Sequence, residues 1–464
     1  MTDIASAQFE FTRAGRSWPL ARGLDWIDIG LVCVFLVGIY TGYNIQVTPT
    51  VPLPSAAAGL AGLLLLWRQR DRIEVTHVNA FLLLMLVLVA SVFVAPDISF
   101  LPKRFTGLLQ LTYSLVISYA LFLTLLKGTR TQVAAIFIVF CAVIFVGCVL
   151  EDYGGLRSIS DAARAKMYSA FIYDADLRDE LLYGQVRPKL FTTEPSAVTF
   201  GYTLFAFVWL MTSTWRWKVL GYVALMVAGI VIMPGPTLLL MMLLYVPYQF
   251  LAGRAWTPTA VRMAILGAFG AMVVVLFFIL GNSVFSNRVA QMAEGADAST
   301  FYRVQGPALV AADVLQKYPF SGTGLTSEGF ISDEVLNVYR SSPEFSPDWQ
   351  FDQTFEVLTN YFWLHWIYFG LVFGLMVLGA LSIWLRTLGV PGLWFCWLVW
   401  SILGQASGAY VGPKTWTVLF LAAAASILAQ RTRETEHPPE EEQFKAFVGP
   451  EPSPAQLASP SAVG

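Results

Sequence analysis

Long runs of apolar residues almost free of charge constrain this chain more than any other feature of its sequence. Hydrophobic residues make up 56% of the 464 residues and charged residues only 13%, whereas a soluble domain usually carries about 25% charged residues. The charges are crowded between the apolar runs. Because a transmembrane helix needs about 20 mostly apolar residues, the sequence predicts an all-α, polytopic membrane protein.

The apolar runs divide into about twelve predicted membrane-spanning helices. One run, 217–251, is too long for a single ordinary crossing, and Pro234-Gly235-Pro236 in its middle predicts a tight hairpin between two spans. A single kinked and strongly tilted helix is the alternative. The predicted spans are 26–43, 51–67, 78–95, 105–126, 132–150, 197–213, 217–233, 236–251, 261–281, 364–385, 392–409 and 413–430.

The positions of lysine and arginine predict which side of the membrane each connection faces. With twelve spans, these residues gather in alternate connections, and the opposite short connections are nearly bare apart from Lys103, Arg104 and Lys414. Because short cytoplasmic connections carry the excess of positive charge, both termini are expected in the cytoplasm. Residues 1–25 are then a cytoplasmic segment, 26–430 the transmembrane domain, and 431–464, rich in Pro, Ser and Ala, a disordered cytoplasmic tail.

Two long connections, about 151–196 and 282–363, are expected on the outer side of the membrane. In the first, residues 159–183 place apolar side chains at helical intervals, which predicts one amphipathic helix. In the second, a helix is predicted over 303–317 and a shorter one near 332–340. A turn at 318–324 is expected to end the first of these helices, because it contains one proline and two glycines.

Glu194 stands directly before Pro195, where the sixth predicted span begins. Two interpretations are open. In the structural one, Thr193 caps the helix and Glu194 interacts favourably with the helix dipole. In the functional one, an acid at the outer membrane surface faces a substrate.

The charges also indicate which ligands the chain can bind. The net charge is −2, so binding of nucleic acid is not expected, and residues 282–356 hold ten acidic and four basic residues. An anionic ligand must therefore be bound by specific arginines, whose planar guanidinium suits phosphate oxygens. All four cysteines lie inside apolar runs, and no cluster has metal-ligand spacing, so neither disulfides, a metal nor another cofactor is expected.

Short motifs in the outer loops resemble the bacterial O-antigen polymerase and O-antigen ligase family. The sequence from Arg303 to Pro319-x-x-Gly322-x-Gly324 is similar to that family's arginine, helix and P-x-x-G-x-G element. A second resemblance lies in 360–374, where Asn-Tyr-Phe-x-Leu is followed by Gly-Leu-x-x-Gly. Residues 187–195 resemble the arginine-containing end of the family's earlier periplasmic loop.

The resemblance implies a membrane-embedded glycosyltransferase of the GT-C type in the bacterial inner membrane, active at its periplasmic face. The reaction would polymerise oligosaccharide repeats carried on undecaprenyl diphosphate into O-antigen or exopolysaccharide. Donor and acceptor would both be lipid-linked, membrane lipids would surround the protein, and a flippase and a chain-length regulator would be its partners. Arg303 and Arg187 would bind the pyrophosphate, with Arg288 and Arg340 as further candidates.

A general base would orient and deprotonate the acceptor hydroxyl. Glu194 is the first candidate and His365 the second, although His365 also fits an interfacial histidine within an aromatic belt. The resemblance makes Asn360 a substrate-binding candidate.

Two positions depart from the family. Thr359 stands where the family's ligases carry histidine, and Pro234-Gly235-Pro236 stands where the family often has Ser-Arg-Gly. These departures favour a polymerase over a ligase that transfers lipid-linked glycan to another acceptor. A polysaccharide or lipid transporter is the alternative of a different class, although it would typically place charged residues at mid-membrane.

Overall fold

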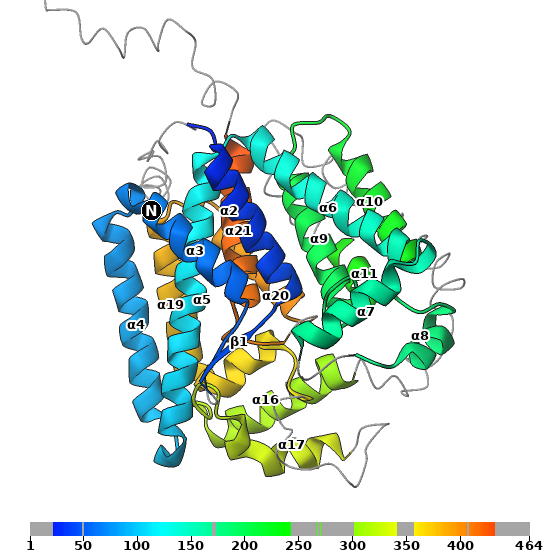
Figure 1. Cartoon of the computed structure of the whole chain (residues 1–464). Helices are drawn as coiled ribbons and strands as arrows, with labels where there is room; N and C mark the ends of the chain where they lie inside the picture. Colours follow the sequence, from blue (N-terminus) through cyan, green and yellow to red (C-terminus); the bar gives the residue numbers. More distant parts are fainter. Residues whose placement is uncertain are drawn as a thin grey trace, which may run out of the picture.

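A computed structural model describes residues 22–48, 51–168, 173–242, 267, 270, 301–340, 357–405 and 408–431. Helices make up most of this part of the chain (Figure 1). The long helices are α2 (Trp26–Thr41), α3 (Ala56–Arg68), α4 (Val75–Val94), α5 (Leu101–Lys127), α6 (Arg130–Tyr153), α9 (Pro195–Thr212), α10 (Lys218–Ile232), α19 (Tyr361–Thr387), α20 (Leu393–Gly404) and α21 (Pro413–Gln430). The shorter ones are α7 (Leu156–Met167), α8 (Asp176–Tyr183), α11 (Pro236–Met242), α16 (Gly306–Lys317) and α17 (Ser332–Tyr339).

Five of the described helices are long and apolar enough to cross a membrane, namely α4, α5 with its preceding turn, α6, α9 and α19. Four shorter apolar helices, α2, α3, α10 and α20, accompany them. The chain is therefore an α-helical membrane protein. Each predicted span in the described residues contains a helix, whereas 261–281 lies outside them except for two residues. The number of twelve spans stays a prediction.

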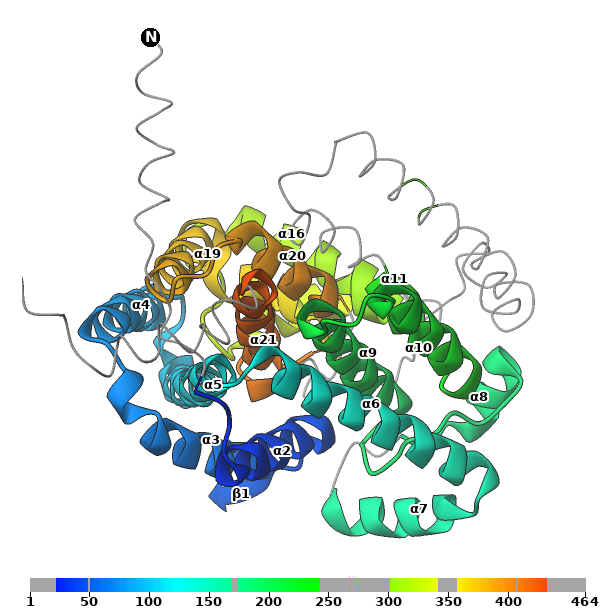
Figure 2. The same cartoon turned by 90° about the horizontal axis from the view of Figure 1, so that it is seen from above.

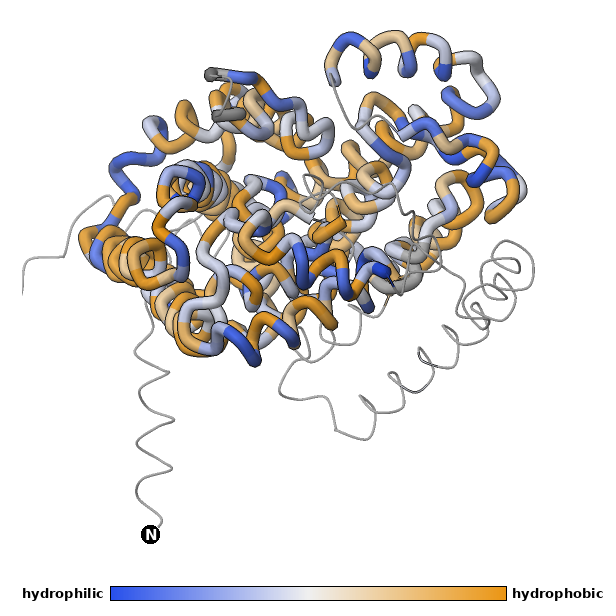
Figure 3. Tube along the Cα trace, turned by 90° about the horizontal axis from the view of Figure 1, so that it is seen from below, coloured by the Kyte–Doolittle hydropathy of each residue, from blue (hydrophilic) through white to orange (hydrophobic). Residues whose placement is uncertain are grey.

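The outer surface of the helix bundle is apolar. Large hydrophobic side chains are exposed at helical spacing along α6, at Val139, Val143, Val146 and Leu150. In Figure 3, α4 at the left is hydrophobic along its length, whereas α7 at the upper right alternates hydrophilic and hydrophobic segments. Exposed apolar faces of this kind are stable in contact with lipid tails and costly in water.

The helix α21 lies in the middle of the bundle, beside α5, α9 and α20 (Figure 2). Its side chains are almost all buried, and Ser118 of α5 and Thr417 form a hydrogen bond of 3.1 Å across the helix pair. Small and hydroxyl-bearing residues allow membrane helices to approach closely and to pair their polar groups.

Buried ionic contacts join the helix ends at one end of the bundle. Asp28 is fully buried and accepts hydrogen bonds from Lys127 and, at 2.7 Å, from Arg68. Arg130 donates to the last carbonyls of α9 and α21, and Arg431 donates to those of α5. The beginnings of α2 and α6 therefore lie beside the ends of α3, α5, α9 and α21.

The hairpin predicted at Pro234-Gly235-Pro236 is confirmed. α10 ends at Ile232, α11 begins at Pro236, and the Tyr222 hydroxyl donates to Met241 O at 2.9 Å. In one continuous helix these two residues, 19 positions apart, would be separated by about 28 Å along the axis. The chain therefore folds back on itself, and the alternative of a single kinked helix is wrong.

The prediction of one amphipathic helix over 159–183 is wrong. The structure has two helices, α7 and α8, and α7 directs Ser160 and Arg164 rather than apolar residues into the protein. Arg164 donates to Thr192 O at 2.6 Å and to Thr193 O at 3.1 Å. The buried guanidinium of Arg164 thus connects the last turn of α7, which ends at Met167, to the end of the same loop.

One described segment departs from the all-α prediction. Strands β1 (Ile45–Thr48) and β2 (Val51–Leu53) form a small antiparallel pair, so the span predicted over 51–67 begins as a helix only at Ala56.

The helix α19 is interrupted at Gly370, and the turn after α16 packs into the interruption. Gly370 has φ 63° and ψ −165°, a conformation available essentially to glycine alone. Leu371 N donates to Pro319 O at 2.7 Å, and Thr323 N donates to Ile367 O at 2.8 Å. The predicted turn is thus confirmed, and its backbone pairs with polar groups that a broken helix leaves open.

We expect Gly370→Ala to destabilise the protein. A Cβ atom there would lie 2.6 Å from Gly322 N and 2.8 Å from Pro319 O, and the backbone conformation alone costs a non-glycine residue about 1–3 kcal/mol. The midpoint of thermal unfolding in detergent should fall. Gly379→Ala, in the same helix with no atom within 4 Å, should leave it unchanged or raise it. Equal midpoints for the two variants would contradict this account of the turn.

Candidate functional site

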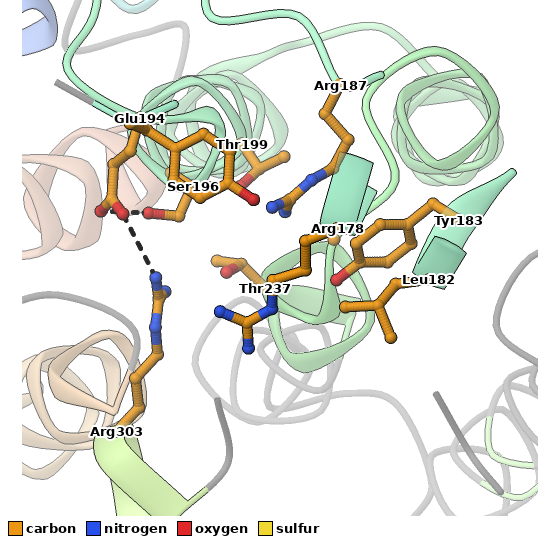
Figure 4. A pocket seen from close by; sticks show the side chains of 11 residues that line it. Arg178, Leu182, Tyr183, Arg187, Glu194, Ser196, Thr199, Thr237 and Arg303 are labelled. Carbon is orange, nitrogen blue, oxygen red and sulfur yellow. Dashed lines mark hydrogen bonds and ion pairs between the residues drawn. The ribbon is translucent and has the colours of Figure 1, made fainter. Parts of the chain in front are cut away.

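A polar cavity lies at the end of the bundle opposite the ionic contacts of Asp28. It has a volume of about 530 Å³, partly open to solvent, and is formed by α8, the beginning of α9, the Pro-Gly-Pro turn and the π-helical turn Phe301–Gln305 (Figure 4). The lining residues are Tyr173, Arg178, Leu182, Tyr183, Arg187, Glu194, Ser196, Thr199, Gly235, Thr237 and Arg303. Three of the candidates predicted from the sequence, Glu194, Arg187 and Arg303, are therefore brought together.

Glu194 is the N-cap residue of α9, and Pro195 begins the helix. The prediction that Thr193 caps this helix is wrong. The Glu194 side chain forms no capping hydrogen bond either. One carboxylate oxygen accepts from the Ser196 hydroxyl, and the other accepts from Arg303 Nη2 at 3.3 Å (Figure 4). The carboxylate thus extends into the cavity and does not accept a hydrogen bond from the backbone amides of α9.

The charges around Glu194 keep it ionised. Burial acts to raise its pKa, but the Arg303 guanidinium, the Ser196 hydroxyl and the Lys414 ammonium outweigh that effect and lower the pKa below the ordinary value of a glutamate. A carboxylate with a lowered pKa contributes its ion-pair stabilisation at neutral pH. That stabilisation is lost only as the pH falls through the lowered pKa.

Arg303 is fixed by its backbone rather than by its side chain. It lies in the π-helical turn that precedes α16, and its carbonyl accepts from Asn360 Nδ2 at 2.7 Å. Asn360 is fully buried and caps α19, because its Oδ1 accepts from the amides of Phe362 and Trp363. Asn360 therefore determines where Arg303 lies and leaves the guanidinium, 33% exposed, available to the cavity.

The Arg187 guanidinium is held by a buried carboxylate and an aromatic ring. Its Nη2 lies 2.7 Å and its Nε 2.9 Å from Asp179 Oδ1, and Asp179 is fully buried. The guanidinium also lies over the Tyr183 ring, 4.6 Å from its centroid. Tyr173 donates its hydroxyl to the same Asp179 oxygen at 2.7 Å. Arg187 contributes a cation at the cavity wall whose position is set by α8.

Further residues of this site were not predicted from the sequence. Arg178 lines the cavity beside Thr237 (Figure 4), and on an amphipathic surface helix an arginine carries no signal of such a role. Lys414, at the beginning of α21, lies 4.2 Å from the centroid of the Phe200 ring and interacts electrostatically with Glu194 and Arg303. The sequence does single out Lys414, because it is one of the few basic residues in the connections that are predicted to face outward and otherwise lack them.

The structure does not bring His365 to the cavity. Its ring is buried among Trp366, Phe369 and Trp400. Nδ1 lies 3.0 Å from the Tyr410 hydroxyl, and Nε2 lies 3.1 Å from Gly374 O. Because both ring nitrogens have protein partners, the surroundings of His365 suit a structural histidine of the helix bundle better than a general base.

Arg340, one of the two weaker arginine candidates, is not among the lining residues. Arg340 is exposed at the end of α17, where it donates to Asn337 Oδ1 at 3.2 Å. Arg288 lies outside the described residues.

No family model matches the chain, and no curated protein is significantly similar to it.

The cavity combines one ionised carboxylate with three arginines, hydroxyl groups and two tyrosine rings. Guanidinium groups bind phosphate oxygens, the carboxylate accepts a proton, and tyrosine rings present flat surfaces to sugar rings. Within the described residues, no three His, Cys, Asp or Glu side chains are grouped as metal ligands. The arrangement fits an anionic, hydroxyl-bearing ligand.

We expect Asp179→Asn to destabilise the protein more than Asp161→Asn. Removing the buried partner of Arg187 leaves a nearly buried cation without a counter-ion, which costs about 3 kcal/mol or more. Asp161 is 45% exposed, and its partner Arg164 keeps its backbone carbonyl acceptors, so its loss should cost about 1 kcal/mol or less. Thermal unfolding in detergent measures both. Equal shifts would show that Asp179 does not hold Arg187.

Proposed function

We propose that the chain polymerises undecaprenyl-diphosphate-linked oligosaccharide repeats into O-antigen or exopolysaccharide at the periplasmic face of the bacterial inner membrane. The observation that carries this proposal is the convergence of Glu194, Arg303 and Arg187 in one cavity at one end of a membrane bundle. The same three residues lie in the segments that resemble the O-antigen polymerase and ligase family.

The arginines suit the leaving group of such a reaction. When the bond between the anomeric carbon and the diphosphate oxygen breaks, negative charge develops on the lipid diphosphate. Guanidinium groups positioned before the reaction stabilise that charge without reorganising. Arg303, whose side chain is 33% exposed, lines the cavity together with Arg178 and Arg187. These arginines would hold the donor.

Glu194 suits the acceptor. Its carboxylate would take the proton from a sugar hydroxyl while the hydroxyl oxygen forms a bond to the anomeric carbon and the lipid diphosphate leaves. Glu194 is 42% exposed and therefore accessible to a substrate in the cavity. Tyr173 and Tyr183, which also line the cavity, would contact the sugars.

One departure from the family falls at the cavity, and the other falls beside a residue that contacts Arg303. Gly235, in the turn that lacks the family's arginine, is a lining residue, and Arg178 of α8 supplies a guanidinium to the same cavity. Thr359 precedes Asn360, whose side chain binds the Arg303 carbonyl. A divergent polymerase with its own set of arginines fits these residues better than a ligase.

A transporter is less consistent with the described charges. Charged side chains that line a transport pathway lie near mid-membrane. In the long helices that the structure describes, the buried charged residues are Asp28, Arg104 and Glu151, and all three are within the first or last four residues of their helix. The buried charges of these helices therefore lie at the two ends of the bundle.

Arg303→Ala should abolish polymer in a cell-based glycan ladder assay while the protein level stays normal. The substitution removes the accessible guanidinium but keeps the carbonyl that Asn360 binds. Arg340→Ala, in the same loop but exposed and away from the lining residues, should keep the ladder. Unchanged ladders for Arg303→Ala would refute the assignment.

The pH dependence of polymerisation distinguishes the two candidate bases. A glutamate base with a lowered pKa stays ionised below its ordinary value, so the acid limb of kcat/KM should lie at or below about pH 4.3. A histidine base would place that limb near pH 6.5, because an unperturbed imidazole titrates at about 6.5. The measurement is polymerisation of lipid-linked repeats in proteoliposomes, and a limb that His365→Gln removes would exclude Glu194.

A further inference from the structure

The two ion pairs of the cavity are held very differently. Asp179 binds Arg187 through two nitrogens at 2.7 and 2.9 Å, and their side chains are 0% and 12% exposed. Glu194 binds Arg303 through a single contact of 3.3 Å, and their side chains are 42% and 33% exposed. A partly exposed pair with one long contact is weak. The pair of Glu194 and Arg303 is therefore the one that a ligand can separate.

A second cation lies beside the first half of α9, the helix that Glu194 precedes. The Lys414 side chain is half-buried over the Phe200 ring and lowers the pKa of Glu194 through its charge. Among the residues that the structure describes, the Lys414 ammonium forms no hydrogen bond or ion pair. Glu194 thus forms an ion pair with one cation, which faces the cavity, and interacts electrostatically with a second, which has a free position for a carboxylate.

We propose that the Glu194 carboxylate occupies an anion subsite on Arg303 in the free protein, and that a phosphate group displaces it toward Lys414. Lys414 is then a positioning residue, which pairs with the Glu194 carboxylate when Arg303 binds the phosphate. The nature of the anion rests on the proposed function. The displacement itself requires only that the cavity bind a phosphate-bearing ligand.

The displacement would couple donor binding to activation of the base. While Glu194 is paired with Arg303, the guanidinium lowers its proton affinity and makes it a poor base. When a phosphate binds Arg303, the effect of the guanidinium is offset, and the negative charge of the phosphate raises the proton affinity of Glu194 against the remaining effect of Lys414. The acceptor would be deprotonated efficiently only when a donor is present, while Lys414 keeps the carboxylate within the cavity.

The test is binding of inorganic pyrophosphate to the full chain in lipid nanodiscs, measured by calorimetry. Glu194→Gln removes the competing charge and should bind about fivefold more tightly, the equivalent of a partly exposed ion pair. Lys414→Gln should bind more weakly, because the displaced carboxylate loses its partner. Size-exclusion profiles and thermal unfolding show whether each variant is folded.

Lys103→Gln is the matched control. Lys103 also follows a proline at the beginning of a helix and lies over a phenylalanine, 5.6 Å from the Phe100 centroid. It is exposed and is not a lining residue, so its loss should not change pyrophosphate affinity.

The double variant Glu194→Gln/Lys414→Gln decides whether Lys414 acts through Glu194. A positioning role predicts that Lys414→Gln has a smaller effect when Glu194 is already neutral. The same fold-change in both backgrounds would overturn that role, and unchanged or weaker binding by Glu194→Gln would overturn the displacement. Absence of pyrophosphate binding by the unmodified chain would also overturn it. Because calorimetry requires no polymerisation, a normal binding result with no glycan product would refute the proposed function alone.

Discussion

A broken helix in a membrane protein must have its free backbone groups satisfied by other protein groups, and this requirement organises the part of the structure around α16 and α19. Gly370 breaks α19, and the turn of residues 318–324 supplies the missing partners through backbone hydrogen bonds. The approach is so close that a side chain on Gly322 or Gly370 would collide with backbone atoms. The turn of residues 318–324 is therefore hydrogen-bonded into the break of α19 and does not merely cover it.

The same contact explains why Arg303 has a defined position. The helix α16 runs from the π-helical turn of Arg303 to the turn at Gly322. Its far end is fixed at Gly370, and its near end is fixed by Asn360, which begins α19 and binds the Arg303 carbonyl. Both ends of one element are thus attached to one helix. The guanidinium is the only part of Arg303 that remains adjustable.

Glu194 is positioned by a different set of buried charges. The Glu151 carboxylate accepts hydrogen bonds from the amides of Lys189 and Leu190, and Arg164 donates to the carbonyls of Thr192 and Thr193. Between these anchors, Leu190 has φ 29° and Phe191 has φ 61°, which is unfavourable for residues with a side chain. The hydrogen bonds of Glu151 and Arg164 offset this conformational cost. They direct the chain into the cavity just before α9.

The sequence predicts the helices and the Pro-Gly-Pro hairpin well, because apolar runs and turn residues are local signals. It also identifies Glu194, Arg187 and Arg303, since a membrane chain with acidic outer loops offers few positions for these groups. It does not predict the partners. Asp179 beneath Arg187, Arg178 across the cavity and the break between α7 and α8 depend on long-range contacts with no local signal.

The balance of charge gives this cavity its selectivity. The segment from 282 to 356 has ten acidic and four basic residues, a balance of charge that does not favour polyanions. Three arginines and one glutamate line the cavity, and Arg187 is already neutralised by Asp179. Arg178 and Arg303 are the other two arginines, and Glu194 is the weak internal partner of Arg303. An anion therefore gains little from general attraction and must compete with Glu194 for Arg303, which favours a compact, highly charged group such as a diphosphate over a diffuse polyanion.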